Sequence, residues 1–210
     1  MATAPRPAGE LAEALAGVGL RVLGECDDGA DTITLIGPDE PAFWPLFTAS
    51  PEYRDGAPDA LDRWSVRVLT DLAAAFGAQA VFPFGGPPYA PFQTWATRSG
   101  RFWPSPIRFL VHEDAGLFAS FRGALRWRKP VSVVTGSKPC LTCATQPCAT
   151  ACPVDAFAGD GYDVAACKAH VASPAGKECR SGGCLARRAC PVGQGRRLPE
   201  QSAFHMRAFL

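Results

Sequence analysis

Eight cysteines gathered between residues 140 and 190 constrain this chain more than any other feature of its sequence. The chain has 210 residues and nine cysteines, and only Cys26 lies outside this group. Eight is the number that two sites of four cysteine ligands require. In chain order the eight are Cys140, Cys143, Cys148, Cys152, Cys167, Cys179, Cys184 and Cys190.

The first four cysteines have nearly the spacing of a bacterial ferredoxin. They read Cys140-x2-Cys143-x4-Cys148-x3-Cys152-Pro153, whereas the ferredoxin run is C-x2-C-x2-C-x3-C-P and gives its fourth cysteine to the other cluster. A short loop places three thiolates around a cubane, and the x3 spacing begins a helical turn that carries the fourth away. Proline suits that first turn because it has no N–H to donate. The x4 gap is longer than the pattern, which a loop accommodates by bulging outward.

The last three cysteines end in the same signature, Cys179-x4-Cys184-x5-Cys190-Pro191. Two Cys-Pro pairs indicate two equivalent halves, each of which gives its last thiolate to the other cluster. We therefore expect two [4Fe–4S] clusters. The first would be held by Cys140, Cys143, Cys148 and Cys190, and the second by Cys152, Cys167, Cys179 and Cys184.

Two other uses of the cysteines stay open. Eight cysteines could hold two structural zinc ions, because C-x2-C knuckles are common in zinc sites. Zinc pairs usually show two such knuckles, however, and only Cys140 and Cys143 have this spacing. A disulfide framework is disfavoured by the odd count and by the first nine residues, which lack the apolar core of a secretory signal. Cys26 is expected to be a small buried hydrophobe beside a strand.

Charge is divided unevenly along the chain, although the net charge is only +1. Residues 1–120 hold eight Lys and Arg against fifteen Asp and Glu, or −7, and residues 121–210 hold thirteen against five, or +8. Cations near anionic thiolate-ligated clusters would offset their charge and tune their potential. Binding of nucleic acid or of an acidic partner is the alternative. The same choice applies to Arg187, Arg188, Arg196 and Arg197, which flank the last ligand.

The remainder of the sequence predicts an α+β fold with helices against a mainly antiparallel sheet. Apolar residues recur at three- and four-residue steps over Ala60–Phe76, which is the strongest helix prediction. A helix is also expected over 8–17, and strands over 20–25, 32–36, 81–84, 107–111, 117–121 and near 131–134. The strand at 117–121 is expected to pair back on 107–111 through the turn at 112–116. No run approaches the about 20 apolar residues of a membrane helix, and we expect a cytoplasmic protein.

The three histidines are not predicted to bind metal. His112 lies in the expected turn and should be solvated, and His170 follows a ligand helix and should pack. His205 belongs to the segment 204–210, which we interpret as an apolar cap over the clusters.

From about Ala90 to Pro191 the order of these features resembles epoxyqueuosine reductase and its corrinoid-dependent relatives, the reductive dehalogenases. The matching segments are Gly100 before Trp103, Ile107–Val111, His112–Gly116, Leu117-Phe118, the first cysteine group, Cys152–Phe157 and Tyr162–Cys167. The stretch Ala115–Gly123 also resembles the cobalamin-processing chaperone related to methylmalonic aciduria.

The resemblance implies a nitroreductase-like or cobalamin-chaperone-like α+β domain followed by a small ferredoxin-like module with two clusters. We accordingly expect a disordered tail at 1–9, the α+β domain at 10–135, the two-cluster module at 136–198 and a cap at 199–210. The resemblance also implies the cross-ligation given above, clusters close enough for fast electron tunnelling, and cobalamin as a further cofactor. An ungapped alignment places Pro88 where the reductase has its catalytic Asp, and Leu210 leaves no room for the helical repeats that help hold tRNA. No catalytic residue is therefore assigned.

Three functions follow as hypotheses. The leading one is an electron-transfer protein whose clusters relay single electrons to a redox partner protein. The second is an iron–sulfur oxidoreductase whose N-terminal domain holds a corrinoid, or a flavin, that the clusters reduce. The third is a binding protein in which clusters or zinc are structural and the basic half contacts nucleic acid.

Overall fold

The computed structural model describes residues 8–128 and 135–210, and the chain divides into two compact units. The first unit combines Met1–Arg101 with Ser120–Gly136, and the second combines Phe102–Ala119 with Ser137–Leu210. Both units are therefore discontinuous in the sequence. They differ from the contiguous division at residue 135 expected from the sequence, because Phe102–Ala119 belongs with the cysteine-bearing segment.

The first unit is built on a four-stranded antiparallel sheet in the order β1-β2-β6-β3. Its strands are β1 (Leu20–Asp28), β2 (Asp31–Pro38), β6 (Gly123–Trp127) and β3 (Gln79–Val81). The hairpin of β1 and β2 confirms the two strands predicted there. The central strand β6 was not predicted. The strand expected at 81–84 ends at Val81, because Pro83 and the following turn cannot continue a ladder.

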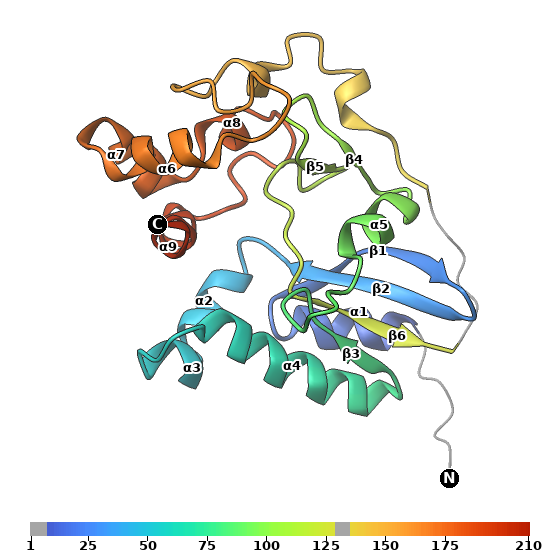
Figure 1. Ribbon diagram of the computed structural model, residues 1–210. Coiled ribbons are helices and arrows are strands. Elements are labelled where there is room, and N and C mark those ends of the chain that lie inside the picture. The colour runs from blue at the N-terminus through green and yellow to red at the C-terminus, as the bar shows by residue number, and fades with distance from the viewer. Residues whose placement is uncertain (1–7, 129–134) are drawn as a thin grey trace. The chain divides into compact units, whose positions relative to one another are not determined.

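Helices cover this sheet, which confirms the mixed α and β class. Helix α1 (Ala8–Ala16) packs on β1, α4 (Ala60–Phe76) packs on β3 and β6, and α5 (Phe92–Arg98) packs on β1 and β2 (Figure 1). The predicted bounds of α4 are confirmed at both ends. Its buried face follows the helical period, and Gly77 ends it in the left-handed conformation that glycine adopts without a Cβ clash.

Two short helices that the sequence did not predict complete the core of the first unit. They are α2 (Phe43–Thr48) and α3 (Pro51–Arg54), each too short to show a periodic pattern. The ring centroid of Phe43 lies 5.7 Å from that of Phe47 and 5.5 Å from that of Trp64, and all three side chains are buried. Aromatic pairs at these distances stabilise a core beyond the area they bury.

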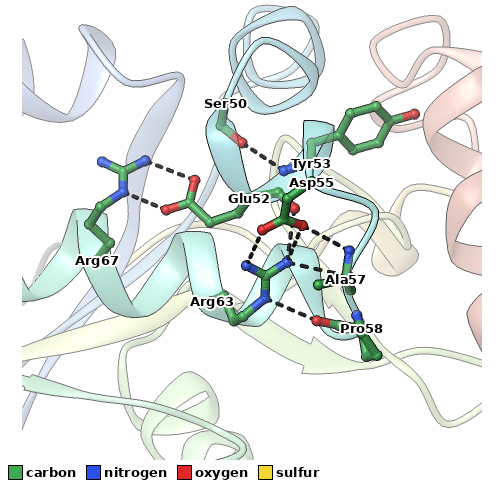
Figure 2. A network of polar contacts seen from close by, with 8 residues as sticks. All are labelled: Ser50, Glu52, Tyr53, Asp55, Ala57, Pro58, Arg63 and Arg67. Carbon is green, nitrogen blue, oxygen red and sulfur yellow. Dashed lines mark hydrogen bonds and ion pairs between the residues drawn. The ribbon is translucent and has the colours of Figure 1, made fainter.

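A network of polar contacts joins α3 to α4 (Figure 2). Ser50 caps α3 by accepting the Tyr53 N–H at 3.3 Å. Arg63 donates two hydrogen bonds of 2.8 Å to the Asp55 carboxylate and bonds to nearby backbone carbonyls. Arg67 donates two hydrogen bonds to Glu52, at 2.5 and 3.1 Å. Two forked guanidinium–carboxylate pairs therefore fix a helix that is too short to be stable alone.

The Glu52→Gln variant tests this network. The hydrogen bonds from Arg67 lower the pKa of Glu52 from 4.5 to about 2. A carboxylate with a lowered pKa stabilises the fold fully above about pH 4.5 and loses that contribution as the pH falls toward 2. At neutral pH we expect the free energy of unfolding, measured with urea, to fall by about 1 kcal/mol in the variant. The effect is modest because the Arg67 side chain is 47% exposed and solvent weakens the ion pair. The loss should shrink below pH 4.5.

Glu13→Gln is the control, because Glu13 is exposed on α1 and its replacement by Gln makes the same change of charge. Equal unfolding midpoints for Glu52→Gln and the control at neutral pH would contradict a stabilising role for the pair.

The second unit begins with a small hairpin of β4 (Phe102–Pro104) and β5 (Leu110–His112). The prediction that 107–111 pairs with a strand at 117–121 was wrong. The chain reverses at 105–108 instead, where the Ser105 N–H bonds to the Phe109 carbonyl at 2.9 Å and Arg108 adopts a φ of 64°. Only an isolated bridge joins His112 to Gly116. The β-structure expected near 131–134 lies outside the described residues.

Short helices make up the rest of the second unit. They are the 3-10 turns η1 (Pro139–Leu141), η2 (Pro147–Ala149) and η3 (Pro174–Gly176) and the helices α6 (Val164–Ala172), α7 (Lys177–Gly182), α8 (Leu185–Arg188) and α9 (Pro199–Phe209). Asp163 caps α6 by accepting the Ala166 N–H at 2.9 Å. Helix α9 packs on α7. None of the helices in the described part of the chain is long and apolar enough to cross a membrane.

Candidate metal centre

The cysteines of the second unit lie on turns and at the ends of short helices. Cys140 lies in η1 and Cys148 in η2, and each turn begins with the proline before the cysteine. Cys167 and Cys179 lie in α6 and α7, and Cys184 is the N-cap of α8. Proline or glycine begins or ends several of these elements, as in η1, η2, η3 and α7, and the backbone changes direction there.

Four of these cysteines line one cavity. Its wall contains Cys140, Cys143, Cys148 and Cys190, which are the four residues predicted to hold the first cluster. The atom-free space is about 330 Å³, including the solvent at its mouth. The rest of the wall comes mainly from the hairpin, η1, η2 and the Cys-Pro segment, with Ser105, Pro106, Val111, Leu117, Pro139, Gln146, Pro191 and Val192.

The thiols of this first group lie close enough to affect one another's charge. Burial raises the pKa of Cys148, and the neighbouring thiols of Cys190, Cys140 and Cys143 raise it further. Burial likewise raises the pKa of Cys140, with additional contributions from Cys190 and Cys143. Four thiolates would repel one another here, and a positively charged metal centre would relieve that repulsion because the thiolate is the ligating form.

The other four cysteines form a second group. Burial raises the pKa of Cys179, and the thiols of Cys167 and Cys152 add to the rise. Burial also raises the pKa of Cys184, which interacts with Cys179. The thiols of Cys152, Cys167, Cys179 and Cys184, the residues predicted to hold the second cluster, are thus near enough to influence one another's charge.

Tyr162 borders the second group and was not singled out as a site residue from the sequence. Burial raises the pKa of its hydroxyl, and the neighbouring thiols of Cys167, Cys184 and Cys152 raise it further. Its ring stacks on Phe157 with centroids 4.9 Å apart, and Phe109 meets both rings edge-on. The Ala156 N–H donates to the Cys152 sulfur at 3.4 Å.

Gly116 is a second residue that sequence reasoning missed. Its φ is +59°, and a Cβ built there would lie 2.1 Å from the Val192 carbonyl oxygen and 3.3 Å from the Cys190 sulfur. Only glycine therefore allows the turn after β5 to lie against the Cys190–Val192 segment. The positive φ and the close approach depend on the tertiary fold, so no local signal marked this residue.

His112 is fully buried, so the prediction that it is solvated was wrong. Its Nδ1 accepts the N–H groups of Ala115 at 3.2 Å and Asp114 at 3.3 Å, and its ring lies 4.7 Å from that of Phe102. The turn folds over the imidazole instead of exposing it. His170 and His205 are partly buried, in α6 and α9.

Cys26 stays apart from both groups. It lies in β1 of the first unit with 1% of its surface exposed, as predicted for a small core residue. Burial raises the pKa of its thiol to about 11, so it is a poor nucleophile and a poor ligand. Over residues 8–128 and 135–210, no three His, Cys, Asp or Glu side chains are arranged to hold a metal ion as they stand.

Comparison with known proteins gives no further guide to this site. No family model matches the chain, and neither a curated protein nor a solved structure matches it.

Proposed function

We propose that this chain is an iron–sulfur electron-transfer protein that carries two [4Fe–4S] clusters in its second unit. The observation that carries the proposal is the cavity walled by Cys140, Cys143, Cys148 and Cys190. Cys190 is distant in sequence from the other three, and the two Cys-Pro endings assign it to the same group. When bound, such clusters accept and release one electron each.

The donor set fits this cofactor. Iron–sulfur clusters take four thiolates, and each of the two groups contains four cysteines. Cys140, Cys143, Cys148 and Cys190 would hold one cluster, and Cys152, Cys167, Cys179 and Cys184 the other. Val111 and Leu117 are almost fully buried beside the first group, where they would exclude water and keep the local dielectric low. The Ala156 N–H directed at Cys152 is the kind of hydrogen bond that raises a cluster's potential.

The fold families of the two units are part of the same proposal. The first unit would be nitroreductase-like or cobalamin-chaperone-like, and the second would be a ferredoxin-like module, as the resemblance implies. A partner redox protein in the cytoplasm would supply or take the electrons. Corrinoid binding stays a prediction from the resemblance.

Anaerobic purification followed by assays of iron, sulfide and zinc on one sample tests the proposal. We expect a broad visible absorption that dithionite bleaches, with about eight irons and eight sulfides per chain. A colourless protein with about two zinc ions would instead support two structural zinc sites, and the proposal would be withdrawn. Titration of the coloured protein with cobalamin, followed by its spectrum, then tests for a bound corrinoid.

The Tyr162→Phe variant tests whether the second group is redox-active. The Tyr162 hydroxyl neighbours the thiols of the second group, where a hydrogen bond donated to a ligating sulfur would stabilise the more negative, reduced state, so removal of the hydroxyl should lower the reduction potential. The expected shift is about 20–60 mV, the one-electron equivalent of a hydrogen bond worth about 0.5–1.5 kcal/mol. A spectroscopic redox titration measures it.

Tyr89→Phe is the matched control, because Tyr89 is 67% exposed in the first unit and should leave both potentials unchanged. If Tyr162→Phe retains its clusters and both potentials equal those of the control, Tyr162 does not contact a redox-active sulfur.

A further inference from the structure

A second pocket in the second unit differs in chemistry from the cysteine cavity. Its atom-free space is about 760 Å³, including the solvent at its mouth, which is large enough for a small ligand. Phe118, Arg188, Arg197 and Ser202 are among its nine lining residues, and none of the nine is a cysteine. The two cavities share no lining residue. Charge compensation for the thiolates therefore does not by itself explain the arginines of this second pocket.

The guanidinium group of Arg197 at this pocket is held in place by Phe118, which follows the hairpin of β4 and β5. Arg197 donates from Nη2 to the Phe118 carbonyl at 2.9 Å, and its guanidinium carbon lies 5.0 Å from the centroid of the Phe118 ring. Arg187 donates from Nε to the Leu117 carbonyl at 2.7 Å and lies at the same distance from that ring. Arg187 is not among the residues that line the pocket, whereas Arg197 is, and a cation fixed in advance in this way loses little side-chain entropy when an anion binds.

The surrounding chain is strongly basic. Residues 179–199 contain five arginines and no Asp or Glu. Arg188 forms an ion pair with Glu178 at 3.2 Å, and the side chains are 40% and 65% exposed. An exposed pair of this kind contributes little energy, so a doubly charged anion entering the pocket can replace Glu178 as the partner of Arg188.

The backbone around the pocket also suits a bulky anion. Gly193 and Gly195 line it with φ values of 74° and 73°, and the side chain of Arg188 lies against Gly182, where a Cβ would be 3.0 Å from Nη1. Pro199 and Ser202 belong to the first turns of α9, whose dipole adds a partial positive charge to the same wall. The glycines leave the polar backbone accessible beside the two guanidinium groups.

We propose that this pocket binds the phosphate group of a small molecule, with Arg188 and Arg197 as the two principal ligands. A planar guanidinium group can donate two parallel hydrogen bonds to two oxygens of one phosphate. A protein surface that carries carboxylates could also bind guanidinium groups, but it would not need a concave site to do so. The proposal does not depend on the nature of the metal centre, because the two cavities are lined by different residues.

Isothermal titration calorimetry of the purified protein at low ionic strength tests the site. The probes are inorganic phosphate, adenosine diphosphate and adenosine. Both phosphates should bind and adenosine should not. Equal affinity for inorganic phosphate and adenosine diphosphate would identify a site for free phosphate. Tighter binding of adenosine diphosphate would identify a site for a phosphorylated metabolite. Arg197→Gln and Arg188→Gln should each weaken binding about tenfold or more, the fold-change expected for loss of a hydrogen bond to a charged group.

Arg207→Gln is the matched control, because Arg207 is exposed on α9 and does not line the pocket. The affinity of the Arg207→Gln variant for phosphate should stay within about twofold of that of the unsubstituted protein. Arg197 also holds the Phe118 carbonyl, so visible spectra and melting curves must show that each variant folds, and Arg188→Gln decides the question if Arg197→Gln does not. Binding of neither phosphate, or equal weakening in the Arg207 control, would overturn the proposal.

Discussion

Replacing Cys148 with alanine is expected to remove about half of the iron, leaving about four atoms per chain. Cys148 lies in the cavity with Cys190, whereas Cys152 follows it closely in sequence but belongs to the other group. Cys148→Ala and Cys190→Ala should therefore leave the same remaining centre. Cys152→Ala should match Cys179→Ala instead. Iron and sulfide assays, with electron paramagnetic resonance of the reduced proteins, distinguish the two remaining centres.

Cys26→Ala is the control for this series and should retain all of the iron, because Cys26 lies in the core of the first unit. The outcome that contradicts the grouping is a Cys152→Ala protein whose spectrum matches that of Cys148→Ala. That result would mean that four consecutive cysteines hold one centre. Loss of iron in the Cys26 variant would require a ligand set different from the one proposed.

Replacing Gly116 with alanine should have the second-largest effect, on both stability and the first cysteine group. A non-glycine residue at φ +59° is strained, and its Cβ would meet the Val192 carbonyl oxygen at 2.1 Å. We expect a loss of about 2–4 kcal/mol in the free energy of unfolding of the second unit. Since the Cys190–Val192 segment must move away, iron should be lost first from the group that contains Cys190.

Gly159→Ala is the matched control in the same unit, because a Cβ there would meet no atom within 4 Å. Urea unfolding and iron assays of both variants make the comparison. A Gly116→Ala protein with the iron content and unfolding midpoint of the Gly159 variant would show that the contact with Val192 is not needed.

Much of the first unit could be predicted from local patterns. The helix at Ala60–Phe76 has an apolar face long enough to show its period and a glycine at its end, and the β1–β2 hairpin has strand-forming residues on both sides of a turn. The strand β6 was missed because its partners, β2 and β3, are far from it in sequence. The pairing of 117–121 was wrong because Pro104 and Pro106 and the positive φ of Arg108 direct the reversal to an earlier position.

The sequence predicted which cysteines would be the ligands of the candidate site, but it did not predict the residues that surround them. The number of cysteines and the two Cys-Pro endings predicted that Cys190 joins Cys140, Cys143 and Cys148, and these four residues line one cavity. Tyr162, Gly116 and the buried state of His112 depend on segments that meet only in the folded chain. The same is true of the pocket at Arg188 and Arg197, where the sequence showed a basic run but not a concave wall.

The interleaving of the two units has a consequence for the order of events on the ribosome. The hairpin segment Phe102–Ala119 is synthesised before β6, which completes the sheet of the first unit, yet it belongs with residues made later. Val111 and Leu117 must wait as exposed apolar side chains until Cys190 and Val192 leave the exit tunnel. If this cavity holds a cluster as proposed, its last-made wall would set the earliest moment of metal loading, and a nascent chain that stalls before Cys190 would present three thiols without the fourth.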